Sequence, residues 1–186
     1  MTEINKERRK WLSLGGIVLG ATLLPNELLA AVSTPKPRVL TFRNINNGER
    51  LTSSLKDGKI TNKTDLKKLD YLLRDRRTQQ IHRIEPQLFS KHYQIQGNLG
   101  LRNTEIQIIC GYRAPATNAA MSARSRGVAQ NSYHMRGQAI DFRIDGISLA
   151  KVRKVAANLN KGGVGYYPRS NFVHIDVGPN RTWSGS

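Results

Sequence analysis

The chain has 186 residues, of which 38% are hydrophobic; this is enough for one domain with a core and excludes a disordered chain. The formal net charge of +17 favours polyanionic partners such as a cell-wall polymer, an anionic membrane or nucleic acid. Because no nucleic-acid-binding motif accompanies the charge, we expect no nucleic-acid partner.

Residues 1–31 have the features of an export signal. Arg8 and Arg9 precede an apolar stretch, from Leu12 to Leu24, that is shorter than the roughly 20 residues needed to cross a bilayer. The paired arginines favour the twin-arginine type, and an ordinary secretory signal is the alternative. Either signal predicts a protein outside the cytoplasm that contacts the membrane only through this segment, if the segment is not cleaved. Residues 32–37 are an expected linker.

The remaining residues, 38–186, are expected to form a single α+β domain whose strands are concentrated late in the chain. In chain order, the predicted elements are strands over 38–44 and 50–55, helices over 64–77 and 86–99, a strand over 105–110, a helix over 117–123, a strand over 139–144, a helix over 148–159, and strands over 164–166 and 172–177.

Local signals support several of these elements. The sequence Asn46-Asn47-Gly48 indicates a hairpin between the first two strands. Ser148 is a typical N-cap residue for the last helix. Cys110, the only cysteine, ends an apolar strand, so we expect a small core residue there. His82 and His92 lie on or near the early helices and are better explained as helix-face residues than as metal ligands.

Three side chains, His134, Asp141 and His174, have the donor types of a zinc site. A catalytic zinc ion takes three such nitrogen or oxygen ligands and leaves a fourth position for water. Residues two apart on a strand point to the same face, so Asp141 shares a face with Ala139, and His174 shares a face with Asp176. Spacing alone remains a weak signal, because a single histidine is more often a surface or core residue than a ligand.

A family resemblance adds to this pattern. Residues 132–141 have the pattern Ser-x-His-x-x-Gly-x-Ala-x-Asp, which is similar at every fixed position to the signature of zinc D-Ala-D-Ala peptidases, and His174 resembles their third ligand. Over nearly its whole length the chain resembles the murein endopeptidase K family of Gram-negative bacteria. The segments that carry this closer resemblance are Gly111 to Arg113, Ser125 to Ala129, His134 to Asp141 and Gly162 to Asp176.

The resemblance implies a fold of the hedgehog and D,D-peptidase type, in which a small antiparallel sheet flanked by helices carries the site. It implies one zinc ion, held by His134, Asp141 and His174, in a periplasmic endopeptidase. The implied substrate is the cross-linked peptide stems of peptidoglycan, with a preference for cross-links between two diaminopimelate residues. A D,D-carboxypeptidase or dipeptidase is one alternative, and a non-catalytic wall-binding zinc module is another.

The other site residues are assigned by chemistry. Several relatives carry a carboxylate three residues before the last histidine, but this chain has Asn171, which cannot act as a base. Asp176 is therefore the candidate general base; its alternative role is to orient a histidine ligand. Arg113 is the candidate to stabilise the oxyanion or to bind a substrate carboxylate. The candidates for substrate contact are Ser132, Tyr133 and Tyr166.

Overall fold

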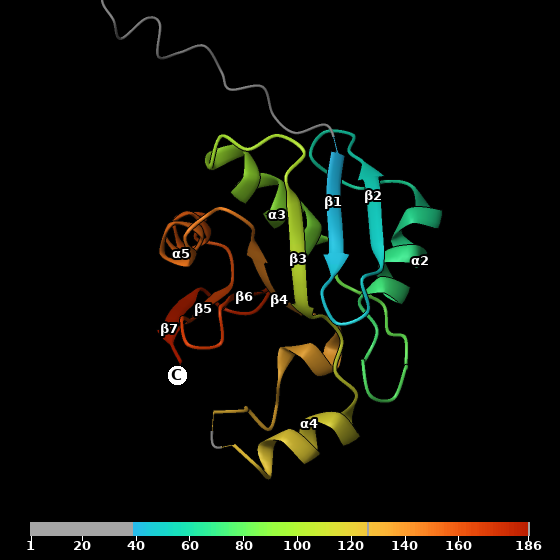
Figure 1. Cartoon of the computed structure of the whole chain (residues 1–186), viewed down its shortest axis with the longest axis vertical. Coiled ribbons are helices and arrows are strands. Elements are labelled where there is room, and N and C mark those ends of the chain that lie inside the picture. The colour runs from blue at the N-terminus through green and yellow to red at the C-terminus, as the bar shows by residue number, and fades with distance from the viewer. Residues whose placement is uncertain (1–38, 126, 186) are drawn as a thin grey trace, which may run out of the picture. The chain divides into compact units, whose positions relative to one another are not determined.

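The structure is a computed structural model that describes residues 39–125 and 127–185. These residues form a seven-stranded mixed sheet with the strand order β2-β1-β3-β4-β6-β5-β7 (Figure 1). The predicted export signal and linker lie outside the described residues. Within the described ranges, no helix combines the length and apolar character that a membrane span requires. The strands are β1 (Val39–Asn44), β2 (Arg50–Ser54), β3 (Glu105–Cys110), β4 (Ala139–Ile144), β5 (Gly163–Tyr167), β6 (Phe172–Asp176) and β7 (Arg181–Ser184).

The predicted α+β class is confirmed, but the prediction of a small antiparallel sheet is wrong. The sheet has seven strands, and two of its pairs, β1 with β3 and β5 with β7, are parallel. Local sequence patterns identify a strand without naming its partner, so these pairings between distant segments left no signal. The last strand, β7, was not predicted at all.

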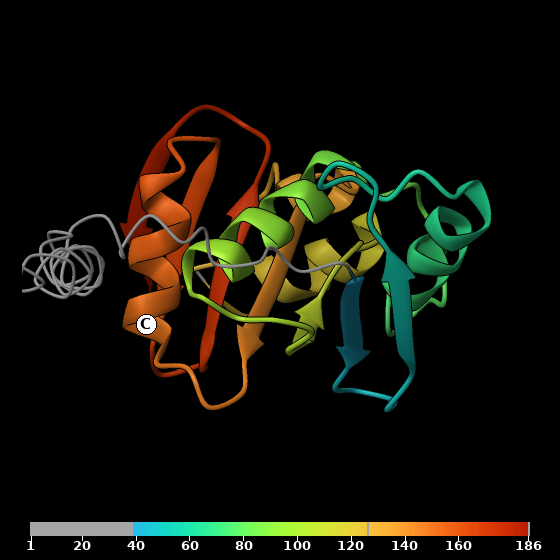
Figure 2. The same ribbon diagram turned by 90° about the horizontal axis from the view of Figure 1, so that it is seen from above.

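The helices are α2 (Lys63–Leu72), α3 (Gln87–Asn98), α4 (Pro115–Ser122) and α5 (Leu149–Asn158). Helices α3 and α5 pack together over one face of the sheet (Figure 2). The contact is apolar and aromatic: Phe89 and His92 of α3 lie edge-on to Phe42 of β1, and His92 also meets Phe142 of β4. These buried side chains form the centre of the core.

Helix α2 ends earlier than the leucine spacing predicts. It stops at Leu72 because the carboxylate of Asp75 accepts hydrogen bonds from the backbone N–H groups of Arg77 and Thr78, at 2.8 and 2.7 Å. This local capture gives the chain a turn in place of another helical turn. At α5, by contrast, the predicted cap is confirmed, since the Ser148 hydroxyl accepts a hydrogen bond from a backbone N–H in the first turn.

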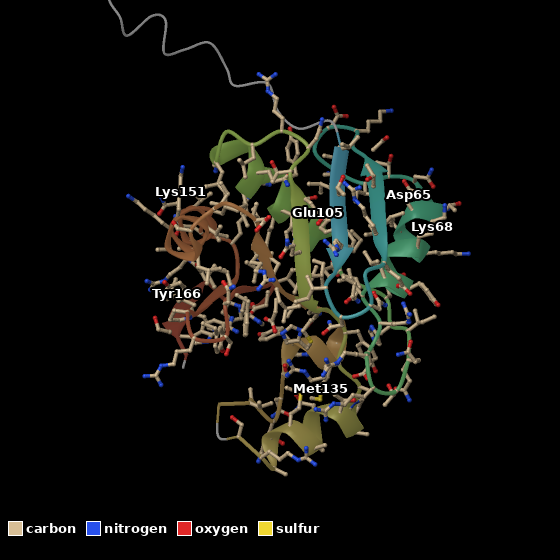
Figure 3. The ribbon with its side chains drawn as sticks, in the orientation of Figure 1. Asp65, Lys68, Glu105, Met135, Lys151 and Tyr166 are labelled. Carbon is tan, nitrogen blue, oxygen red and sulfur yellow. The ribbon has the colours of Figure 1, made fainter. Side chains whose placement is uncertain are left out.

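The opposite face of the sheet carries polar side chains from β4 and β6. The antiparallel register places Asp141 opposite His174 and Ala139 opposite Asp176, so all four side chains share one face. A 3-10 helix (Tyr133–Arg136) supplies His134 to this face. Met135, of the same 3-10 helix, lies between the sheet and α4, below the strand that begins at Glu105 (Figure 3).

Candidate metal centre

The side chains of His134, Asp141 and His174 converge on one point. The Nε2 atom of His134 lies 3.2 Å from Asp141 Oδ1 and 3.2 Å from His174 Nδ1, and the last two atoms are 2.8 Å apart. All three residues are buried. The structure therefore brings together, from a 3-10 helix and two strands, two donors of one sequence motif and a third donor that lies 33 residues after Asp141.

The hydrogen bonds around both histidines leave the converging nitrogens free to act as ligands. Nδ1 of His134 lies 2.7 Å from the carbonyl oxygen of Gly111, which can only accept, so this nitrogen carries the hydrogen. Nε2 of His174 lies 3.1 Å from the carboxylate of Asp176 in the same way. Partners of this kind fix the tautomer and the ring orientation of metal-binding histidines.

The donor atoms fit zinc in type and spacing. A tetrahedral zinc ion with bonds of about 2.0–2.1 Å keeps its ligand atoms about 3.3 Å apart, close to the separations in this cluster. Two imidazole nitrogens and one carboxylate oxygen also match the ligand count of a catalytic zinc site, which keeps a further position open.

Electrostatics favour a positive charge at this point. Burial alone would lower the pKa of His134, but the neighbouring Asp141 carboxylate and Cys110 thiol raise it to about 10. Burial would raise the pKa of Asp141, yet its contacts with His134 and His174 hold it far below its usual value. A divalent cation would meet the same preference, after displacing the protons from its ligands.

The 3-10 helix that carries His134 is fixed at both ends. At its start, the buried Ser132 hydroxyl accepts a hydrogen bond from the backbone N–H of His134. At its end, Gly137 adopts a left-handed conformation with φ of 65°. A side chain at Gly137 would overlap the carbonyl oxygen of Arg83, so only glycine fits. Ser132, a candidate for substrate contact, therefore caps the element that positions a proposed ligand.

Asp176 lies behind His174 and is fully buried. Its carboxylate accepts hydrogen bonds from Arg181, at 2.6 Å for the shortest, and from the backbone N–H groups of Gly163 and Gly178. Burial would raise the pKa of Asp176, but these bonds and the one to His174 hold it well below its usual range. Asn171 is exposed, with φ of 56°, in the turn between β5 and β6.

Arg113 lies at the edge of the cluster, with most of its side chain buried. Its Nη2 atom is 3.9 Å from Asp141 Oδ2 and 3.6 Å from Cys110 Sγ, while Nη1 donates to Asn118 at 3.3 Å. Its backbone N–H donates to the carbonyl oxygen of His134. The guanidinium is therefore held beside the donor atoms.

The tyrosines divide between the two faces of the sheet. Tyr166 lies opposite Val173 in the register, under Arg153 of α5, so the structure does not bring it to the site. Its neighbour Tyr167 lies on the face of His174 and accepts a hydrogen bond from Trp183 Nε1 at 2.8 Å. Of these two neighbouring residues, Tyr167 and not Tyr166 lies on the face of the sheet that carries the donor cluster.

Tyr133 and Trp183 lie near the cluster. The Trp183 ring centre is 5.2 Å from that of His174, which leaves it at the edge of the donor cluster. The guanidinium carbons of Arg136 and Arg181 lie 4.4 and 5.1 Å from the centre of the Tyr133 ring. Arg181 also binds Asp176, which contacts His174. Arg181 therefore links the Tyr133 ring to the carboxylate that holds His174.

Cys110 is not the core residue that the sequence predicts. A bulge between Ile108 and Cys110 turns the cysteine to the face of Asp141, its partner across the strands. Ligand atoms of Cys110, His134 and Asp141 lie within 4.8 Å of one another. The Nδ1 atom of His174 lies within 3.2 Å of both other donors, so the set with His174 has the spacing of zinc ligands.

Sequence reasoning missed four residues that support the site. They share no motif, and each acts through side-chain contacts that form only in the folded chain. Asn118 binds Arg113 and the 129–130 backbone, Arg181 binds Asp176, and Asp75 ties two loops together. The fourth, Trp183, packs beside His174, and no residue pattern in the sequence assigns it to the site.

The sheet and the cluster of two histidines and an aspartate are the framework of a peptidase domain. A family model described as "Peptidoglycan L,D-endopeptidase MepK" matches residues 32–183. The chain therefore belongs to the peptidoglycan L,D-endopeptidase MepK family.

Relatives support this membership along the whole chain. The chain is 60% identical over 185 residues to the "Probable peptidoglycan L,D-endopeptidase MepK" of Haemophilus influenzae, and all of both chains is covered. It is 50% identical over 183 residues to the peptidoglycan L,D-endopeptidase MepK of Escherichia coli (strain K12), covering 98% of this chain and all of the relative. The same figures hold for the protein of that name from Shigella flexneri.

Proposed function

We propose that this chain is an exported zinc endopeptidase that hydrolyses peptide cross-links in peptidoglycan, with a preference for links between two diaminopimelate residues. The observation that carries the proposal is the convergence of three donor atoms, on His134, Asp141 and His174, within 3.2 Å of one another. The names of the relatives supply the substrate class.

In this proposal His134, Asp141 and His174 hold one zinc ion. When bound, zinc would supply Lewis-acid chemistry: it would polarise the scissile carbonyl and lower the pKa of bound water to about 7. Arg113, beside Asp141, binds the carbonyl oxygen or a nearby carboxylate through its guanidinium. Tyr133 forms part of the wall around the peptide.

We assign Asp176 to positioning, the second of its two roles considered above. A general base must reach the proton that it removes, whereas the Asp176 carboxylate is 0% exposed and faces Nε2 of His174, the nitrogen on the far side of the ring from the donor cluster. Its contribution is to hold His174 in one tautomer and one orientation. Asn171 supplies no base in its place.

The proposed location is the periplasm, since the substrate lies outside the cytoplasm and residues 1–31 have the features of an export signal. The net charge of +17 supports attraction to the anionic cell wall.

The test combines metal analysis with digestion of purified muropeptides. The wild-type protein should contain one zinc ion per chain and convert cross-linked dimers into monomers. The His134→Ala variant should lose zinc and activity together, while His82→Ala, an exposed histidine outside the cluster, should keep both.

Other outcomes would assign the protein differently. Loss of terminal D-Ala alone, with dimers intact, would indicate a carboxypeptidase. Binding to sacculi without release of any fragment by the zinc-loaded protein would indicate a non-catalytic wall-binding module.

A further inference from the structure

A cavity of about 280 Å³ opens beside the candidate metal centre. Asp141 and Cys110 line it on the side of the cluster, and the segment 74–77, which follows α2, lines it on another side. Thr117 and Met121 of α4 complete part of the wall. The cavity therefore joins a proposed metal ligand to a loop that lies more than 60 residues earlier in the sequence.

The wall of this cavity is strongly basic. Arg74 is already neutralised, because its guanidinium forms two hydrogen bonds with the Glu49 carboxylate, at 2.7 and 2.8 Å. Arg76 and Arg77 are exposed, and within residues 39–125 and 127–185 neither forms an ion pair with a carboxylate. Among the residues that the structure describes, Arg76 donates only to the side chain of Asn46, at 3.2 Å. The arginines that line the cavity are Arg74, Arg76, Arg77 and Arg113.

The two acidic residues of the wall do not offset this charge, because both are engaged. Asp141 contacts the two histidines of the cluster. Asp75 is buried, and its carboxylate joins the segment 74–77 to the start of α4. The groups that donate hydrogen bonds to Asp75 are the backbone N–H groups of Arg77, Thr78 and Ala114 and the hydroxyl of Thr117.

We infer that this cavity is a subsite for a free carboxylate of the substrate, and that Arg76 and Arg77 determine this specificity. The inference rests on the proposed function and names a feature of its substrate. Diaminopimelate is a diamino diacid, so each such residue in a cross-link keeps a carboxylate that is not part of the cleaved bond. Guanidinium groups bind carboxylates with paired, charge-assisted hydrogen bonds, and an amide in place of the carboxylate would lose the charge.

The test measures binding, so that it does not depend on turnover. The probe is the tripeptide L-alanyl-γ-D-glutamyl-diaminopimelate. One form has free diaminopimelate carboxylates, and in the other form these carboxylates are amidated. Each form is titrated by calorimetry into protein whose zinc content has been measured. The wild-type protein should bind the free form about 10-fold to 100-fold more tightly than the amidated form. The double variant Arg76→Gln/Arg77→Gln should lose this preference, with an unchanged melting temperature because both side chains are exposed.

Arg102→Gln is the matched control, since Arg102 is also exposed but does not line the cavity, and it should keep the wild-type preference. Equal binding of both tripeptides by the wild type would overturn the inference. So would a preference that survives in the double variant, because groups other than Arg76 and Arg77 would then bind the carboxylate. A preference lost as predicted in a protein that cleaves no muropeptide would support the subsite and reject only the proposed hydrolysis.

Discussion

The Asp176 carboxylate accepts five hydrogen bonds from four residues, and this environment decides what the carboxylate can do. Two of the five bonds come from Arg181, so the negative charge is balanced within the fold. A carboxylate held this way is a weak base, because its pKa lies well below the usual range. Because it contacts Nε2 of His174, it can act on a metal held by the proposed ligands only indirectly.

Asp176→Asn should therefore weaken zinc binding by about 10-fold to 100-fold, the usual cost of changing the partner of a metal-binding histidine. Competition against a chelator of known affinity measures this change. Asp145→Asn, an exposed aspartate in a turn, should leave the affinity as it is. An Asp176→Asn variant with wild-type zinc affinity and a turnover reduced by roughly 10² or more would instead make Asp176 the base.

His92 sets a pH dependence that belongs to the core. Burial lowers its pKa from 6.5 to about 4, because the ring is enclosed by Phe42 and Phe142. Nδ1 donates to the carbonyl oxygen of Leu88, and Nε2 has no hydrogen-bond partner among the described residues. The neutral ring is thus the form that fits the fold.

Between pH 6.5 and about 4 the unfolded chain binds a proton at His92 and the folded chain does not. The free energy of unfolding should therefore be highest above pH 6.5 and fall by about 3 kcal/mol as the pH falls to 4. Urea unfolding of the metal-free protein measures it. In His92→Gln this part of the pH dependence should vanish, while His82→Gln, at an exposed histidine, should retain the wild-type slope.

At the scale of elements, the sequence predicts where the strands lie better than it predicts the face of the sheet to which each side chain points. The predicted bounds of β3 and β4 are those observed, because both strands are apolar runs with clear ends. Cys110 was nevertheless placed in the core, since a regular strand would point it the same way as Ile106 and Ile108. The bulge before Cys110 reverses its side, and no local residue type announced it.

The same limit applies to the loop that follows α2. Leucine spacing reports which helix face is apolar, but the end of α2 depends on Asp75. That carboxylate also binds Ala114 and Thr117, which are close to it only in the folded chain. The proposed metal ligands could be predicted from a contiguous motif and one remote histidine. The cavity depends on contacts between segments and could not be predicted.

The 3-10 helix depends on Gly137. Gly137→Ala should destabilise the protein by about 1–3 kcal/mol for the left-handed backbone alone, and by more because the added carbon overlaps Arg83. It should also weaken zinc binding, since His134 belongs to this helix. Gly146→Ala is the control: φ is 72° there, but nothing lies within 4 Å of the added carbon. Equal losses of stability in the two variants would show that the close approach to Arg83 is unimportant.

At the scale of the whole molecule, zinc binding at the site should raise the free energy of unfolding of the protein. Ligand binding to the folded state alone adds about 2.7 kcal/mol at a free concentration 100 times Kd. For a chain of this size, a chelator should therefore lower the melting temperature by about 5–10 °C. The His134→Ala variant should show no shift of its melting temperature on chelation. A wild-type melting temperature that does not change with the chelator would show that metal binding does not stabilise the fold.

The position of β7 beside β5 has a consequence for biosynthesis. Arg181 and Trp183 brace Asp176 and His174, and the ribosome adds them only after all three proposed ligands. A nascent chain that has just acquired its last histidine still lacks the strand that orients it. The hydrolytic centre should thus mature late, so that a partly translated chain carries no working wall-degrading activity.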